Sequence, residues 1–299
     1  MMRLLQCIPN ISEGRDKNRI ASIAEEVKKV KKVKLLSVSS DKDHHRSVLT
    51  FIGEPKAVKE AALSMALKAI EVIDMREHRG AHPRLGAVDV LPFVPIQEVE
   101  MEEANQIARD LGRDLGKRGI PVFFYEASAT SPERRDLPSI RKGEYEGLKE
   151  KLRDSKWKPD EGPEDFNPKS GATVVGARFP LVAYNVNLRT EDLSIAREIA
   201  KKVRTKDGGL PNVRAMGVAL KEKGMVQVSM NLTNYRVTNI PKVFELIREE
   251  ALKAGVEISE SEIVGLIPLG VLEGVAQRYL KYPNFSIRQV IEQRILEFE

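Results

Sequence analysis

Apolar residues in the first hundred positions recur with two spacings, one typical of strands and the other of helices. The apolar run from Leu4 to Ile8 predicts a strand, and further strands are predicted over 33–38, 47–52 and 88–96. Helical spacing predicts a helix near 20–30 and a long amphipathic helix over 55–75. The predicted order is β-α-β-β-α-β, which is the order of a ferredoxin-like α/β layer.

The same order recurs in the last third of the chain. Strands are predicted over 181–188, 214–220, 225–232 and 262–269, and helices over 193–203 and 241–254, with Gly255 at the second helix's C-cap. We therefore expect an α+β protein of two ferredoxin-like α/β sandwich subdomains, 1–178 and 179–299, with a ligand groove between them. A closing helix is predicted from a Ser286/Gln289 capping box and an apolar stripe formed by Ile287, Val290, Ile291 and Leu296.

The segments between the two repeats are less regular. A helix is predicted over 101–118 and a buried strand over 122–126, whereas the polar segment 131–158 is expected to be helix and loop on the surface. Residues 159–171 hold three prolines and two glycines. This composition is typical of a domain boundary and equally of an ordered binding loop.

Composition narrows the class of protein. The 299 residues include 49 Lys and Arg against 44 Asp and Glu, so the charge is mixed and there is no basic tract with interleaved aromatics to favour nucleic acid. The single cysteine, Cys7, excludes a disulfide framework and a thiolate zinc site. Because no apolar stretch reaches about 18 residues, we expect no signal peptide or membrane span and a cytoplasmic location.

Residues able to take part in acid–base chemistry are most frequent in the segment 74–96, which carries His78 and His82 among several arginines and carboxylates. The other two histidines, His44 and His45, lie in a similar polar turn. Histidine is the usual proton shuttle near neutral pH, and arginine neighbours favour its neutral, basic form. We expect His82, fixed by Pro83, to be a loop-borne general base. The alternative for each histidine is a solvated turn residue, and Asp41 and Asp43 could pair with His44 and His45 structurally.

Other kinds of site fit the sequence less well. His78 and His82 have the spacing of two metal ligands on one helix, but Gly80 and Pro83 interrupt a helix and the arginines oppose a bound cation, so no metal is expected. The chain also lacks a phosphate-binding glycine pattern and the elbow of a serine hydrolase.

Four segments together resemble a known family. They are CIPNISEGRD, SSDKDHHRSVLTFIGEP, IDMREHRGAHPRLGAVDVLPFVPI and GPEDFNPKSGATVVGAR, which begin at residues 7, 39, 73 and 162. In order and spacing they are similar to the successive motifs of the formiminotransferase family, the glutamate formimidoyltransferases, and the likeness continues to about Leu269. The animal bifunctional enzymes carry a cyclodeaminase portion that this chain does not match.

The resemblance implies an enzyme, usually a homodimer, that binds folate between two α/β subdomains. It transfers a formimino group between N-formimino-L-glutamate and N5 of tetrahydrofolate, a reaction of histidine degradation and one-carbon metabolism. The histidine of its GxHPRxGAxDV motif, here His82, is the catalytic acid/base, and 162–171 is similar to its folate-contacting loop. One departure is His45, which stands where the family usually has asparagine. A formyl donor and a folate-binding protein without turnover are the alternative functions.

We expect four basic side chains, Arg46, Arg84, Lys169 and Arg178, to bind substrate carboxylates, although surface solvation is as good an explanation for any one of them. Asp89 or a nearby carboxylate is expected to orient the His82 ring. The complete set of expected substrate-binding residues is Asn10, Ser12, Glu13, Asp43, His45, Arg46, Arg84, Asp89, Gly162, Pro163, Phe166, Lys169, Ser170, Gly171, Ala172, Thr173 and Arg178.

Overall fold

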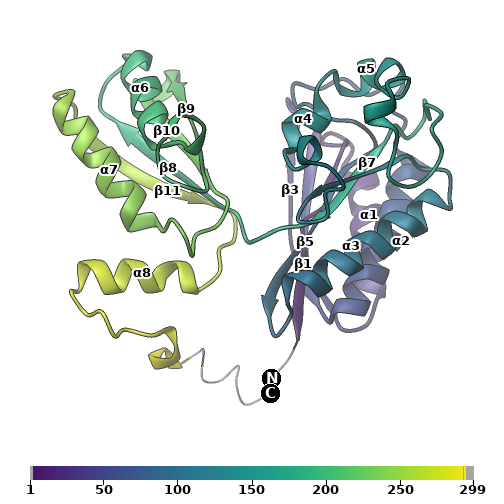
Figure 1. Cartoon of the computed structure of the whole chain (residues 1–299), viewed down its shortest axis with the longest axis horizontal. Helices are drawn as coiled ribbons and strands as arrows, with labels where there is room; N and C mark the ends of the chain where they lie inside the picture. The colour runs from purple at the N-terminus through teal and green to yellow at the C-terminus, as the bar shows by residue number, and fades with distance from the viewer. Residues whose placement is uncertain (1–2, 292, 294–299) are drawn as a thin grey trace. The chain divides into compact units, whose positions relative to one another are not determined.

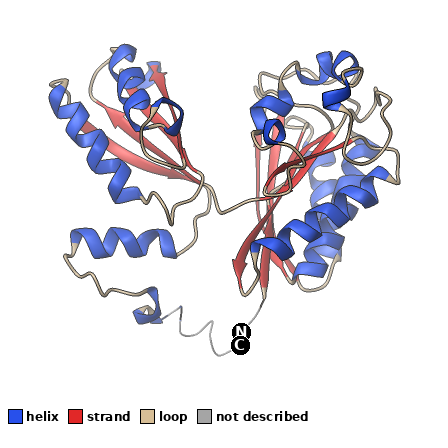
Figure 2. Cartoon of the chain, viewed as in Figure 1, coloured by secondary structure: helices blue, strands red, loops and turns tan. Residues whose placement is uncertain are grey.

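The computed structural model describes residues 3–291 and 293. The chain divides into two compact units, residues 1–178 and 179–299 (Figure 1). Both are mixed α/β units built on a sheet (Figure 2). The predicted α+β fold with two α/β subdomains is confirmed.

The first unit contains seven strands and five α-helices within its described residues. In chain order they are β1 (Leu4–Cys7), β2 (Asn10–Ile11), α1 (Lys17–Lys29), β3 (Val33–Asp41), β4 (Arg46–Gly53), α2 (Pro55–Val72), β5 (Val88–Gln97), α3 (Met101–Gly116), β6 (Val122–Glu126), α4 (Leu137–Arg141), α5 (Glu144–Lys151) and β7 (Thr173–Ala177). Single 3₁₀ turns cover Pro132–Arg134 and Ser155–Trp157.

The sheet of the first unit joins a ferredoxin-like part to a parallel extension. β3 pairs with β4, which pairs with the broken first strand β1 and β2, and these pair with β5, all antiparallel. β7 then lies parallel to both β5 and β6. Strand β7 was not predicted, because its five residues form a short, continuously buried run without alternation.

Helices cover both faces of this sheet. The main core packs buried residues of α1, α2 and α3 against one face, where Ile23, Met65 and Leu111 are fully buried (Figure 1). A smaller cluster on β5, β6 and β7 includes Ile140 of α4 and Leu148 of α5. The polar segment 131–158 is therefore helix and loop, as predicted, but it also contributes to a core.

The second unit has four strands and three helices within its described residues. They are β8 (Val182–Leu188), α6 (Leu193–Val203), β9 (Val213–Leu220), β10 (Met225–Leu232), α7 (Ile240–Lys253), β11 (Ile258–Val264) and α8 (Gly270–Tyr279), with 3₁₀ turns at Thr205–Asp207, Lys221–Lys223 and Ile287–Gln289. The strand order is β11-β8-β10-β9, and every pairing is antiparallel. This is the order of a ferredoxin-like sheet, with α6 and α7 packed on its apolar face.

The largest differences from the predicted boundaries are in α2 and β11. Helix α2 ends at Val72 rather than Met75, because the Met75 N–H donates to the carbonyl of Lys169 instead of continuing the helix. Strand β11 begins and ends earlier than the predicted range 262–269. Its pairing with β8 includes the exposed residues Glu260 and Glu262, and it stops before Gly265, whose φ is +81°. The helix α8 that follows was not predicted.

The tail follows the prediction in part. The Ser286/Gln289 capping box is present and opens a 3₁₀ turn over Ile287–Gln289, and residues 291 and 293 are helical. Leu296, the last residue of the predicted stripe, lies outside the described residues. In the described part of the chain, no helix is both long enough and apolar enough to cross a membrane.

Candidate functional site

Three loops at one end of the strands in the first unit's sheet bring the predicted polar residues together. They are the segment after β2, the β3–β4 turn and the long α2–β5 connection. The Ser12 N–H donates to Ala87 O at 2.9 Å and its Oγ donates to Gly86 O at 2.7 Å, while the Ala81 N–H donates to Asp43 O at 3.1 Å. These bonds tie residues more than 35 positions apart into one surface.

Gly80 permits this close approach. A Cβ atom at this position would lie 2.4 Å from His44 O and 2.7 Å from the Cβ of His45. Both distances are too short for real atoms, so a side chain here would push the two histidine-bearing loops apart.

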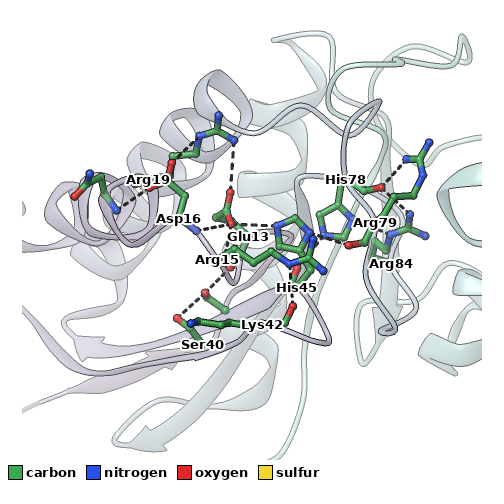
Figure 3. Close-up of polar contacts among 12 residues, drawn as sticks. Glu13, Arg15, Asp16, Arg19, Ser40, Lys42, His45, His78, Arg79 and Arg84 are labelled. Carbon is green, nitrogen blue, oxygen red and sulfur yellow. Dashed lines mark hydrogen bonds and ion pairs between the residues drawn. The ribbon is translucent and has the colours of Figure 1, made fainter.

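His45 and Glu13 form a buried pair at the centre of this surface (Figure 3). The His45 ring directs Nε2 to a Glu13 carboxylate oxygen at 3.1 Å and Nδ1 to Arg79 O at 3.0 Å. Both neighbours are hydrogen-bond acceptors, so the His45 ring is held between a carboxylate and a backbone carbonyl.

The backbone at His45 explains which residue types suit it. Its φ is +49°, in the left-handed region where asparagine and histidine are enriched. Burial raises the pKa of Glu13, but the N–H groups of Asp16 and Arg15, followed by His45, outweigh burial and lower it. His45 therefore contacts a carboxylate and a carbonyl of its own chain.

His78 lies against His45 in the neutral form. The two rings stack with centroids 4.2 Å apart and an interplanar angle of 10°. His78 Nε2 donates to His45 O at 2.8 Å, and Nδ1 accepts from Arg84 Nε at 3.2 Å, which fixes one tautomer. Burial, followed by the positive neighbours, lowers the pKa of His78.

Arg84 is fully engaged with its own chain. Its Nη1 contacts a carboxylate oxygen of Glu144 at 2.9 Å, and both Nη atoms contact Glu146, at 2.8 and 2.6 Å. Arg84 is 5% exposed and clamps α5 to the histidine loop. In this structure its guanidinium holds two glutamates, and its expected contact with a substrate carboxylate stays a prediction.

His82 sits beside Arg46 rather than beside a carboxylate. Arg46 Nη1 lies 2.6 Å from His82 Nε2, and since guanidinium groups only donate, Nε2 accepts and Nδ1 carries the ring proton. Nδ1 is buried and has no hydrogen-bond partner among the described residues. Burial, then Arg46 and Arg141, lowers the pKa of His82 to about 4. The ring is neutral at neutral pH.

The expectation that Asp89 orients the His82 ring is corrected by the structure. Asp89 is buried, accepts the Leu85 N–H at 3.0 Å and pairs with Arg141 at the end of α4. Its carboxylate is used to hold the loop entering β5 and to neutralise Arg141, which itself faces the His82 site. No other carboxylate of the described residues takes its place, because His82 Nδ1 has no partner.

The segment 162–178 meets the site through residues 170–172. Ser170 O accepts the Ala87 N–H at 2.8 Å, Gly171 bridges to Gly86, and the Ala172 N–H donates to Leu85 O at 3.1 Å. Gly171 has φ +65°, and a Cβ there would lie 2.1 Å from Leu85 O. This part of the segment therefore supports the loop that carries His82.

The other residues expected in the site lie outside this cluster. Gly162 packs its backbone beside Ile120, and the half-buried Pro163 follows it. Phe166 packs on Tyr145 with ring centroids 5.4 Å apart. Lys169 donates to Glu71 O, Thr173 begins β7, Arg178 follows β7, and Asn10 donates to Ile8 O within its own turn. Their expected substrate contacts stay predictions.

A pocket of about 260 Å³ opens beside the Glu13–His45 pair. His78 and Ser12 line it, together with Arg15 and Arg19, but His82 does not. The described residues contain no group of three or more His, Cys, Asp or Glu side chains arranged to hold a metal ion.

Sequence reasoning missed the partners supplied by 131–158. Arg141, Glu144 and Glu146 are the ion-pair partners of Asp89 and Arg84. The available signal was that Arg84 and Asp89 flank a short apolar stretch. If the loop is buried there, each charged side chain needs a partner, and that partner can come from a distant part of the chain. The interleaved charges of 131–158 resembled an ordinary solvated surface instead.

Comparisons with known proteins agree with this picture. Residues 4–178 match the family model "Formiminotransferase domain, N-terminal subdomain", and 183–297 match "Formiminotransferase domain". The chain is 47% identical to "Glutamate formimidoyltransferase" of Thermoplasma acidophilum, over 98% of each chain. It is 42% identical to the protein of that name from Streptococcus pyogenes, over 99% of this chain and 100% of the other.

A longer relative matches over part of its length. "Formimidoyltransferase-cyclodeaminase" of Rattus norvegicus is 41% identical over 93% of this chain and 53% of its own length. The two family models together span most of the chain in the order in which their segments occur. The chain therefore belongs to the formiminotransferase family.

Proposed function

We propose that this chain is a glutamate formimidoyltransferase that moves a formimino group between N-formimino-L-glutamate and tetrahydrofolate. The relatives' names support the reaction. The observation in the structure that supports it best is His82, a neutral imidazole whose Nε2 lies 2.6 Å from a guanidinium. A neutral imidazole can accept a proton, and a neighbouring guanidinium can bind a carboxylate.

The proposed chemistry needs one shuttling base. N5 of tetrahydrofolate attacks the formimino carbon and forms a new C–N bond, and a tetrahedral intermediate results. The old C–N bond to glutamate breaks once the glutamate nitrogen gains a proton. His82 Nε2 takes the proton from N5 and returns it to this leaving nitrogen, so no proton is consumed overall. The products are 5-formiminotetrahydrofolate and L-glutamate.

The proposal includes the finer points that the family resemblance implies. We propose folate and formiminoglutamate as the small-molecule substrates, a homodimer, a cytoplasmic location and a place in histidine degradation. Sedimentation of the purified chain tests the dimer independently of activity, since a monomer at micromolar concentration would contradict that part alone.

The function is tested by a two-donor assay. Purified protein is mixed with tetrahydrofolate and either N-formimino-L-glutamate or N-formyl-L-glutamate, and the folate product is identified by mass spectrometry. We expect turnover with the formimino donor that depends on both tetrahydrofolate and protein. Faster turnover with the formyl donor would assign the alternative transferase. Folate binding by calorimetry without product from either donor would make the chain a folate-binding protein.

A further inference from the structure

Arg46 is a half-buried guanidinium that lacks a carboxylate partner. It begins β4, and its Nη1 donates to His82 Nε2. Among the described residues, the two neighbouring carboxylates form their ion pairs elsewhere, Asp89 with Arg141 and Asp41 with His44. Burial, followed by the like charge of Arg141, lowers the pKa of Arg46, and the attraction of Asp89 and Asp41 offsets this only in part. A charge in this position is costly unless an anion arrives.

The nearby carboxylates are committed to other partners. Asp89 is taken by Arg141 and the Leu85 N–H. Asp41 accepts the backbone N–H groups of Asp43 and His44 and pairs with the His44 ring at 3.1 Å. Of the two guanidinium groups near His82, only Arg141 is paired with a buried carboxylate, so these surroundings carry an excess of positive charge.

The contact between Arg46 and His82 also has a chemical cost. A general base accepts a proton through its lone pair, and the lone pair of Nε2 points at a cationic donor. In this arrangement His82 holds the correct tautomer but is a weak base. Something must draw Arg46 away, or neutralise it, before Nε2 can accept a proton from a substrate.

We propose that Arg46 binds a carboxylate of the formimino donor, and that this pairing releases His82 Nε2 so that donor binding activates the base. The inference rests on the proposed function, because the donor's glutamate part supplies the carboxylate. Arg46 contacts substrate in this scheme and acts on the reaction through His82. In the absence of donor, the masked imidazole cannot take protons from folate.

The charged groups that face His82 come from several elements. Arg46 of β4 and Arg141 of α4 are cationic, Asp89 of β5 neutralises Arg141, and His44 of the β3–β4 turn lies with its ring centroid 6.1 Å away. A carboxylate on Arg46 adds negative charge at the shortest of these contacts. It therefore shifts the His82 equilibrium toward the protonated form, and the pKa of His82 rises.

Histidine NMR titration tests the masking without any turnover. The ring signals of His82 are assigned by comparison with His82→Gln and followed from pH 3.5 to 8, in wild type and in Arg46→Gln, each with and without L-glutamate. We expect L-glutamate to raise the wild-type His82 pKa. In Arg46→Gln we expect a raised pKa without ligand and no further rise with it. The control is Arg153→Gln, whose exposed arginine pairs with Glu150 on the surface, and it should titrate as wild type.

Steady-state kinetics tests carboxylate binding. We expect Arg46→Gln to raise the KM for formiminoglutamate about 10- to 100-fold, the range for losing a hydrogen bond to a charged group, with the KM for tetrahydrofolate unchanged. Arg46→Lys keeps the positive charge but loses the planar fork, so we expect it to restore part of the donor KM and the glutamate response of His82. Circular dichroism confirms that each variant is folded.

The outcomes separate this inference from the proposed function. Turnover of formiminoglutamate together with a His82 pKa that ignores L-glutamate would overturn the inference and leave the function standing. An equal glutamate-induced rise in wild type and Arg46→Gln would also overturn it. A glutamate response that requires Arg46, in a protein that transfers no formimino group, would support the inference and reject the function.

Discussion

The two units share one sheet arrangement but differ in what that sheet buries. The strand order is β3-β4-β1/β2-β5 in the first unit and β9-β10-β8-β11 in the second. Both follow from the same β-α-β-β-α-β order along the chain. Among the described residues, the first unit buries charged and titratable polar side chains such as Glu13, Arg84 and Asp89. The polar side chains buried in the second unit are uncharged: Asn185, Asn187, Gln227 and Thr238.

The connections explain this difference. In the first unit the α2–β5 connection runs from residue 73 to 87 and carries His78 and His82, whereas the corresponding α7–β11 connection covers only 254–257. A short connection leaves no backbone on which to mount converging side chains. The comparison teaches that the ferredoxin-like layer is a neutral scaffold, and that its loops decide whether it carries chemistry.

The largest expected effect removes the base from the first unit. Replacing His82 by Gln should lower turnover by about 10²- to 10⁴-fold, because the shuttling proton loses its acceptor while the hydrogen-bonding amide keeps the loop in place. The assay is formimino transfer with folate affinity measured in parallel by calorimetry. Unchanged turnover with intact folate binding would remove His82 from the mechanism and with it the claimed asymmetry between the units.

A second test concerns the cost of buried charge. Asp89→Asn should lower the free energy of unfolding by about 3–5 kcal/mol, because Arg141 would stay half-buried without its carboxylate. Urea denaturation followed by circular dichroism measures this. The matched variant Asp89→Asn/Arg141→Leu removes both charges and should recover much of the loss. A single variant as stable as wild type would mean that this pair is as solvated as a surface salt bridge.

A third test uses pH. The pKa of His82 is about 4 in the folded chain, below the ordinary value of 6.5, so the unfolded chain binds the proton first as pH falls. Stability should therefore decrease as pH falls from about 6.5 to about 4, with a contribution from His82 of no more than about 1.4 kcal/mol per pH unit. Urea denaturation across this range should give a steeper decline for wild type than for His82→Gln. Parallel curves would contradict the lowered pKa.

The smallest expected effect lies in the second unit. Gln227 Nε2 donates to Asn187 Oδ1 at 2.8 Å and to a Glu262 carboxylate oxygen at 3.1 Å. Gln227→Met keeps the shape and should lower the free energy of unfolding by about 1–2 kcal/mol, because the buried Asn187 Oδ1 and the Glu262 carboxylate both lose a donor. A loss as large as that of Asp89→Asn would show that the amide network carries as much energy as the buried charges, which would erase the contrast between the units.

Much of the fold could be predicted because burial imposes a period on the sequence. The apolar spacing of α1, α6 and α7 and the runs of β4, β8 and β10 predicted these elements, since each must turn one face to a core. The end of α2 could not be predicted, because the Met75 N–H donates to the carbonyl of Lys169, a residue distant in the sequence. The residues around Met75 give no indication of this partner.

The sequence by itself determined which chemistry the chain can carry: the four histidines, their loops and the motifs that identify the family. Only the tertiary structure decided how those groups act. It assigned Asp89 to Arg141 instead of His82, placed two glutamates of α5 on Arg84, and set Arg46 against the Nε2 lone pair. Charge pairing acts through space, so these partners lie 36 to 62 positions apart in the sequence, and periodicity along the chain does not indicate them.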